Sequence, residues 1–465
     1  MTNDMTQGKP LQLFLSFSIP LLIGNMFQQL YSMVDTIIVG KFLGEKALAG
    51  VGSAGSMVFL IGGFLIGLTS GFAVLVAQRF GAKDDAGVKK AIASNIILSG
   101  IFTVLTTLVM MQLVQPLLHM MKTPDDVFVY ASDYITVIYA GIFTQVGYNM
   151  FAGILRALGD SKTPLYFLII SCILNIILDI VFILQLDMGV AGVAYATNVS
   201  QGISAILCLI YSYKKFDAFK LKKEDFNVPK DYYKMHICTG FPMALQFSIT
   251  AIGIMTVQGA INSFGSTVVA AYTAASKVVQ LVMQPVITYG VAVATYVGQN
   301  LGAGRIDRIK EGVKVITKVS VVTSVIAATI LILFGKPLVG MFLENPRDEI
   351  FVYSQEVLLY AAIFYVPLGQ IFVYRNALQA MGQSFMPMMA GFFELVARAL
   401  AANTLPAFIG FTGICLSDPI AWLSASIPLF LYYQRYMKRL EIPQDVEATL
   451  SEETTNTMAE TGQAI

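Results

Sequence analysis

The chain has 465 residues, of which 56% are hydrophobic and 13% charged, and its mean hydropathy is +0.69. Soluble globular domains carry about a quarter charged residues, so this composition excludes an ordinary soluble domain and predicts an integral membrane protein. The formal net charge is only +1, and no basic stripe with interleaved aromatic residues argues for a nucleic-acid partner.

Apolar stretches of about 20 residues, the length that crosses a hydrocarbon layer of about 30 Å as a helix, recur along the chain. We place twelve of them, near residues 12–40, 50–78, 91–113, 131–157, 165–184, 189–213, 236–262, 267–298, 314–334, 355–380, 386–409 and 411–434. Basic residues gather in the connections after the second, fourth, sixth and eighth stretches. The positive-inside rule therefore places these connections and both termini in the cytoplasm. The polar, acidic residues 441–465 are expected to form a disordered cytoplasmic tail.

Short motifs recur in the two halves of the chain in the same order, at an offset of 221–223 residues. The pairs are "SIPLL" with "GFPMA", "AQRFGAKDD" with "GQNLGAGRI", "LRALGDSKTP" with "LQAMGQSFMP", and "GVAG" with "GFTG". Chance recurrence of Gly and Pro at helix ends is the competing explanation, and the shared order argues against it. We therefore predict an all-α fold of two six-helix lobes, 1–213 and 236–440, joined by a cytoplasmic linker at 214–235. Because six is even, the lobes are parallel repeats, an arrangement of secondary transporters with the substrate site in the cleft between them.

Two carboxylates lie at the same depth inside the predicted spans of the first half. Asp35 follows "FQQLYSMV" and lies six residues before Lys41, and Asp179 lies six residues before Gln185. Both spans run outward, so the two carboxylates share a depth. An ionised Asp at the centre of a membrane helix costs about 2.5–3.5 kcal/mol, and no basic residue of these spans lies near that depth. A site that shares a proton or binds a cation is therefore favoured.

Other polar residues fall on the same helix faces. Gln28, Tyr31 and Asp35 are spaced by three and four residues, and Asn175 precedes Asp179 by four. The next span brings Thr197 to a similar depth. If these three spans pack together, the residues line one polar pocket; the alternative is that each is hydrogen-bonding glue between helices.

The charges within the spans of the second half are different and include Lys277, Arg375, Glu394, Arg398 and Asp418. Glu394 and Arg398 are four residues apart, and we predict an ion pair within one helix. Lys277 and Asp418 have no partner that the sequence reveals. Pairing with each other and lining a transport route remain alternatives.

Several of these motifs are similar to those of one family. Apart from the acidic tail, the chain resembles the multidrug and toxic compound extrusion (MATE) transporters, and within them the bacterial and archaeal branch that includes the DinF-like proteins. The resemblance rests on "FSIPLLIGNMFQQLYSMVDTIIVGKFLGEKALAGVG", on "AQRFGAKDD" with its echo "GQNLGAG", on "GILRALGDSKTP" and on "NIILD". It implies a twelve-helix fold and export of organic cations or amphipathic drugs in exchange for H+ or Na+.

The resemblance also implies roles for particular residues. An acidic residue of helix 1 is matched by Asp35, an Asn/Asp pair of helix 5 by Asn175 and Asp179, and a Thr of helix 6 by Thr197. These four residues are the expected coupling site for H+ or Na+. Pro20 matches a proline associated with bending of helix 1; from the residue alone, a passive kink is the simpler reading.

Two further matches and one departure complete the comparison. Gln28 and Tyr31, which precede the acid in helix 1, are assigned to the substrate pocket. Another branch of the family binds Na+ through acids in helices 7 and 10, whereas here the seventh span has none and the tenth has only Glu356 at its outer edge. We therefore expect coupling in the first lobe.

The sequence thus predicts a monomeric, non-enzymatic antiporter of the cytoplasmic membrane. Its expected partners are the lipid bilayer and a small drug or metabolite. The cysteines and histidines form no ligand cluster, so no cofactor and no metal other than Na+ at the coupling site is predicted. The alternative on the same fold is an exporter or flippase of a metabolite or a lipid-linked substrate. An intramembrane aspartyl protease is disfavoured because "ALGD" at Ala157–Asp160 lacks the first glycine of GxGD, and a passive channel predicts no uphill transport.

Overall fold

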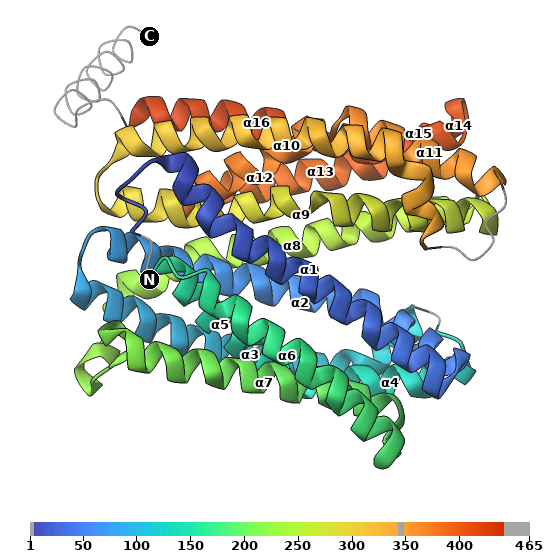
Figure 1. Ribbon diagram of the computed structural model, residues 1–465, viewed down its shortest axis with the longest axis horizontal. Helices are drawn as coiled ribbons and strands as arrows, with labels where there is room; N and C mark the ends of the chain where they lie inside the picture. Colours follow the sequence, from blue (N-terminus) through green and yellow to red (C-terminus); the bar gives the residue numbers. More distant parts are fainter. Residues whose placement is uncertain (1–3, 122, 343–347, 441–465) are drawn as a thin grey trace, which may run out of the picture.

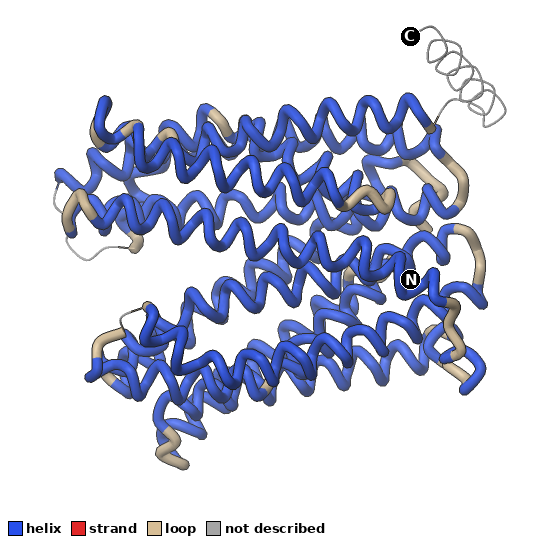
Figure 2. Tube along the Cα trace, turned by 180° about the vertical axis from the view of Figure 1, so that it is seen from behind, coloured by secondary structure: helices blue, strands red, loops and turns tan. Residues whose placement is uncertain are grey.

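The computed structural model describes residues 4–121, 123–342 and 348–440, and in these ranges all regular structure is helical (Figures 1 and 2). The tail predicted at 441–465 lies outside the described residues. The first half contains α1 (Pro10–Leu43), α2 (Glu45–Gly81), α3 (Asp85–Met120), α4 (Asp125–Ala140), α5 (Ile142–Ala157), α6 (Lys162–Ile180) with the π-helical η1 (Val181–Gln185), and α7 (Gly189–Lys215). The second half contains α8 (Lys230–Asn262), α9 (Ser266–Gly302), α10 (Ile306–Gly340), α11 (Asp348–Ile363), α12 (Tyr365–Ala380), α13 (Phe385–Thr404), α14 (Pro406–Ile409), α15 (Phe411–Cys415) and α16 (Ser417–Arg439). Two short 3-10 turns, η2 (Asp217–Phe219) and η3 (Lys223–Phe226), lie between the halves.

Ten helical segments in the described ranges are long and apolar enough to cross a membrane, and two bent pairs bring the number to twelve. The pairs are α4 with α5, bent by 48°, and α11 with α12, bent by 51°. The stretches predicted as single spans at 131–157 and 355–380 are therefore broken. At the first break, the Asn198 side chain of α7 donates a hydrogen bond of 2.7 Å to the Val137 carbonyl, and Gly141 leaves room for that side chain. The Val137 carbonyl also accepts a 3.1 Å hydrogen bond from the backbone N–H of Gly141, so the side chain of Asn198 adds a second donor at the break.

The helices of the two halves correspond closely. α2 and α9 both have 37 residues, and each follows a glycine with positive φ, Gly44 at 85° and Gly265 at 89°. α1 and α8 both contain a proline, at Pro20 and Pro242, and each half has one bent pair at the same place in the order. The repeat read from the sequence is therefore also a repeat of helices.

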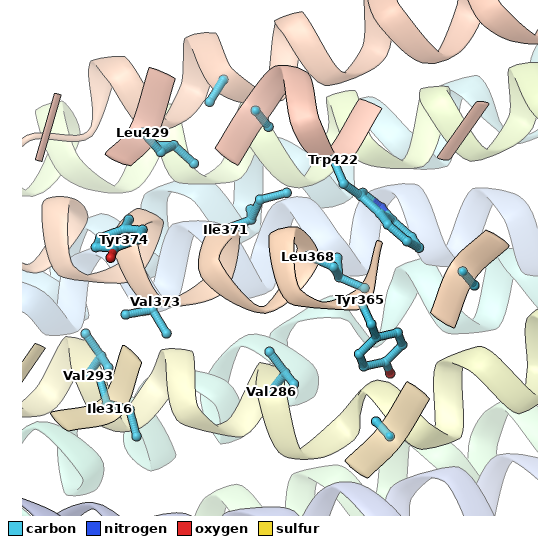
Figure 3. Close-up of a cluster of buried hydrophobic side chains, with 14 of the residues drawn as sticks. Val286, Val293, Ile316, Tyr365, Leu368, Ile371, Val373, Tyr374, Trp422 and Leu429 are labelled. Atoms are coloured by element: carbon cyan, nitrogen blue, oxygen red, sulfur yellow. The ribbon is translucent and has the colours of Figure 1, made fainter. Parts of the chain in front are cut away.

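Helices α1 and α2 of the first half contact α8 and α9 of the second half, while the other helices lie to either side (Figure 1). The largest buried apolar cluster joins α9, α10, α12 and α16 and includes Val286, Val293, Ile316, Ile371 and Leu429 (Figure 3). The cluster also includes Phe14 and Phe17 of α1, so it joins the first half to the second.

The two halves meet in a reciprocal seam at the end of the molecule that carries the basic connections. The Gln78 side chain donates a hydrogen bond of 2.8 Å to the Ala380 carbonyl, and its repeat partner Gln299 donates one of 2.8 Å to the Ala157 carbonyl. Gln299 also accepts a 2.9 Å hydrogen bond from the backbone N–H of Met5, which is fully buried. One glutamine therefore joins both halves and the N-terminal segment.

Glycine is required at this seam, which gives a prediction. A Cβ at Gly302 would overlap the backbone of Gln78. Gly302→Ala is expected to lower the free energy of unfolding by about 1–3 kcal/mol, because the backbones cannot approach without strain. Thermal unfolding in detergent micelles measures the change. Gly259→Ala is the control, since a Cβ there meets no atom within 4 Å, and equal melting temperatures for the two variants would contradict the prediction.

Candidate functional site

Helices α1, α6 and α7 pack together in the first half and bring the predicted polar residues to one place. The hydroxyl of Tyr31 on α1 lies 3.0 Å from the hydroxyl of Thr197 on α7. Asp35 and Asp179 are close enough to act on each other electrostatically, and Tyr31 lies beside both. Four residues assigned from three separate spans therefore form one cluster.

Of the two carboxylates of this cluster, Asp179 is buried and Asp35 is half-buried, and neither has a basic partner among the described residues. Asp179 and Asn175 have no exposed surface. Both Asp179 oxygens, both polar atoms of the Asn175 amide and Oδ1 of Asp35 lack a hydrogen-bond partner among the described residues. Neither aspartate takes part in any ion pair of the described residues. Because an unpaired buried carboxylate is costly, a proton or a cation held between the two would lower the free energy of this arrangement.

The backbone changes directly after Asp179. The α-helix ends at Ile180 and continues as the π-helical η1, Val181–Gln185. This π-helical turn ends the helix, because residues 186–188 connect it to α7. Nothing in the apolar sequence of this stretch distinguishes it from ordinary α-helix.

Tyr134 is a member of the cluster that sequence reasoning missed. It lies on α4, and it is near enough to both Asp35 and Asp179 to act on them electrostatically. A tyrosine close to the outer end of a span is usually read as an anchor at the membrane interface. The fold of α4 against α7, which the sequence does not reveal, places it at the carboxylates instead.

The two residues assigned to the substrate pocket are placed differently. Tyr31 belongs to the carboxylate cluster, whereas Gln28 lines a small cavity of about 40 Å³. That cavity is also lined by polar residues of α5, α6 and α7, namely Gln145, Tyr148, Asn149, Ser171, Gln201 and Ser204. Its volume is of the order of one or two water molecules, so in this conformation it has no room for a drug.

The helical repeat agrees with comparisons to known proteins. The MatE family model matches residues 20–181 and 241–403. The chain belongs to the MATE family. It is 29% identical over 436 residues to the "Probable multidrug resistance protein YpnP" of Bacillus subtilis (strain 168), covering 93% of this chain and 96% of that protein. It is 24% identical over 438 residues to the "FAD transporter" of Shewanella oneidensis, covering 91% and 94%.

A solved structure gives the same result for the fold. An outward-facing multidrug resistance MATE family transporter of the MOP superfamily superposes with a TM-score of 0.89 at 25% identity, over 95% of this chain and 100% of that one. The prediction of an all-α membrane protein with the MATE fold is therefore confirmed. The chain is a multi-pass membrane transporter and not an enzyme.

Pro20 is buried within α1 of this MATE protein, and the helix continues unbroken on both sides of it from Pro10 to Leu43. A change of bend at Pro20 therefore stays a prediction.

The second half holds a network of charges. Glu394 accepts a hydrogen bond of 2.8 Å from Arg398 within α13, which confirms the predicted ion pair, and one of 3.1 Å from Arg375 of α12. Asp418 of α16 pairs with Arg398 at 2.7 Å, so the alternative in which Asp418 pairs with Lys277 is wrong. The Lys277 side chain is exposed and joins none of the ion pairs of the described residues. Helix packing, and not spacing along the chain, decides the partners of Arg375 and Asp418.

Proposed function

We propose that this MATE protein is a secondary antiporter that exports organic cations or amphipathic drugs in exchange for H+ or Na+. The observation that carries the proposal is the pair of neighbouring carboxylates, Asp35 and Asp179, which lies within the spanning helices without a basic partner. Asn175 and Thr197 complete the coupling site. Drug resistance proteins among the relatives support the substrate class.

The charge of this site couples binding of the ion to the conformational change of the protein. A cation shifts a conformational equilibrium only by the difference in its affinity for the two states, and two neighbouring carboxylates within the spanning helices provide such a difference. Helix α1 runs from the seam, where Met5 contacts Gln299, through Pro20 to Asp35. Protonation of Asp35, or Na+ binding there, would thus act through α1, with a change of bend at Pro20, on the end where the halves meet.

We further propose the lobes, the orientation, the oligomeric state and the branch of the family. Residues 1–213 and 236–440 act as two lobes that alternate access, with 214–235 as the linker. The protein lies in the cytoplasmic membrane with both termini in the cytoplasm, works as a monomer and belongs to the DinF-like branch. The concentration of lysines from Lys214 to Lys234 supports a cytoplasmic linker.

Transport by the purified protein tests the proposal. Proteoliposomes loaded with ethidium receive either an imposed pH gradient or an imposed Na+ gradient, and fluorescence follows efflux against the ethidium gradient. We expect uphill efflux under one of the two gradients, which names the coupling ion. Efflux that only dissipates the ethidium gradient would indicate a passive channel, and no efflux under either gradient would contradict drug antiport.

A metabolite is the second candidate substrate, because one relative is named an FAD transporter and fold does not fix substrate. In that case, proteoliposomes loaded with FAD in place of ethidium should show gradient-driven efflux. Uphill export of FAD without export of ethidium would favour this candidate.

A further inference from the structure

Four charged side chains form a chain of ion pairs in the second half, three of them buried and the fourth, Asp418, with 34% of its side chain exposed. Arg375 contacts Glu394, Glu394 contacts Arg398, and Arg398 contacts Asp418, at 3.1, 2.8 and 2.7 Å. Arg375, Glu394 and Arg398 are each less than 8% exposed, and the hydroxyl of Tyr272 donates a 3.2 Å hydrogen bond to Asp418. Two positive and two negative charges balance within the network.

Two members of this network stand at the repeat positions of the first-half site. Arg398 is the fourteenth residue of α13, and Asn175 is the fourteenth residue of α6. Asp418 and Thr197 each lie eight residues after a glycine with positive φ at the start of the following helical segment. The repeat therefore replaces a neutral Asn/Thr pair by an Arg/Asp ion pair.

The helix that faces this position, α8, has a glycine where the guanidinium lies. Gly253 of α8 lies eleven residues after Pro242, as Tyr31 of α1 lies eleven residues after Pro20. A Cβ at Gly253 would lie 2.6 Å from Nη1 of Arg398. Nη1 has no hydrogen-bond partner among the described residues. The guanidinium thus takes the space beside α8 that the tyrosine ring takes beside α1.

The two halves also differ in their net charge at this place. Val257 and Ala402, both buried and apolar, stand at the repeat positions of Asp35 and Asp179. The first-half site therefore has two carboxylates and needs a cation from outside. The second half has two carboxylates and carries its cations as arginine side chains.

We propose that Arg398 is a resident cation of the second half, held between α8, α13 and α16 where the first half takes its coupling cation between α1, α6 and α7. Removing its charge exposes a latent site for a monovalent cation, with oxygen ligands from Glu394, Asp418 and Tyr272. The comparison between halves rests on the proposed coupling site in the first half. It follows that only the first half responds to the ion, whereas in the second half the guanidinium of Arg398 always occupies the corresponding position.

The charge count predicts the behaviour of Arg398→Asn, which restores the residue type found at the repeat position. Glu394 and Asp418 then face Arg375 alone, so the network has one uncompensated negative charge. A single monovalent cation restores neutrality. Arg398→Lys is the matched control, because it changes the side chain and keeps the charge.

Binding of radiolabelled Na+ to the purified protein tests the proposal at about pH 8, where free carboxylates are ionised. The variants are made in a background with Asp35→Asn and Asp179→Asn, so that all bound Na+ belongs to the second half. We expect one additional Na+ per chain for Arg398→Asn and none for Arg398→Lys. No additional Na+ for Arg398→Asn, or equal gains for both variants, would overturn the proposal.

Folding of the variant is itself a readout. Without Na+ the melting temperature of Arg398→Asn is expected to fall, and Na+ but not choline should raise it again. A variant that fails to fold in both salts would overturn the proposal. The same binding assay on the wild-type protein, with Asp35 and Asp179 intact, tests the first-half site separately. If the wild-type protein binds no Na+ while the Arg398→Asn variant binds one, Na+ coupling in the first half is contradicted and the resident cation is supported.

Discussion

Asp179→Asn is expected to abolish uphill drug efflux. Asp179 has no exposed surface, neither of its oxygens has a partner among the described residues, and Asp35 lies beside it. The amide keeps the size of the side chain and removes its charge, so a cation gains little from binding. A coupling free energy of about 1–3 kcal/mol corresponds to a loss of about 5- to 150-fold in the effect of the ion on transport. The initial rate of ethidium efflux under the imposed gradient measures it.

An exposed aspartate provides the control for this experiment. Asp133 lies on α4 with its side chain exposed, and Asp133→Asn should transport at the wild-type rate. Melting temperatures of both variants show whether the fold is kept. A folded Asp179→Asn protein that still performs uphill efflux would place coupling outside the first half, in which case the charge network around Glu394 becomes the next candidate.

Glu394→Gln is expected to cause the largest loss of stability. Glu394 is the shared partner of Arg375 and Arg398, and all three side chains are buried. Removing one charge of a buried ion pair leaves the other uncompensated, which typically costs about 3–5 kcal/mol. The midpoint of thermal unfolding in detergent micelles should therefore fall clearly.

The control is a glutamate of the same half that makes little contact. Glu349 is exposed near the start of α11, and surface substitutions usually change stability by less than about 0.5 kcal/mol. If Glu394→Gln and Glu349→Gln melt at the same temperature, the network does not stabilise the fold.

The sequence revealed the spans and the first-half cluster because both depend on regular spacing. A span needs only length and hydropathy, and Asp35 and Asp179 could be placed at one depth from the loop residues that follow them. The i to i+4 spacing of Glu394 and Arg398 likewise fixes a contact within a single helix. In each case the geometry of one helix carries the inference.

Features that depend on packing between helices could not be predicted. Tyr134 reaches the carboxylates because α4 packs against α7, and Asp418 meets Arg398 because α16 packs against α13. The break at Gly141 depends on Asn198 of another helix. A single sequence does not show which residues of different helices come into contact.

The reciprocal seam also bears on the origin of the fold. Gln78 of the first half contacts Ala380 of the second, and Gln299 of the second contacts Ala157 of the first, each through the same kind of hydrogen bond. Contacts in which residue i meets j and the counterpart of j meets the counterpart of i define the isologous interface of a two-fold symmetric homodimer. This end of the molecule thus has the form that two copies of a single six-helix chain would build, while Arg398 and Asp418 mark where the copies have diverged.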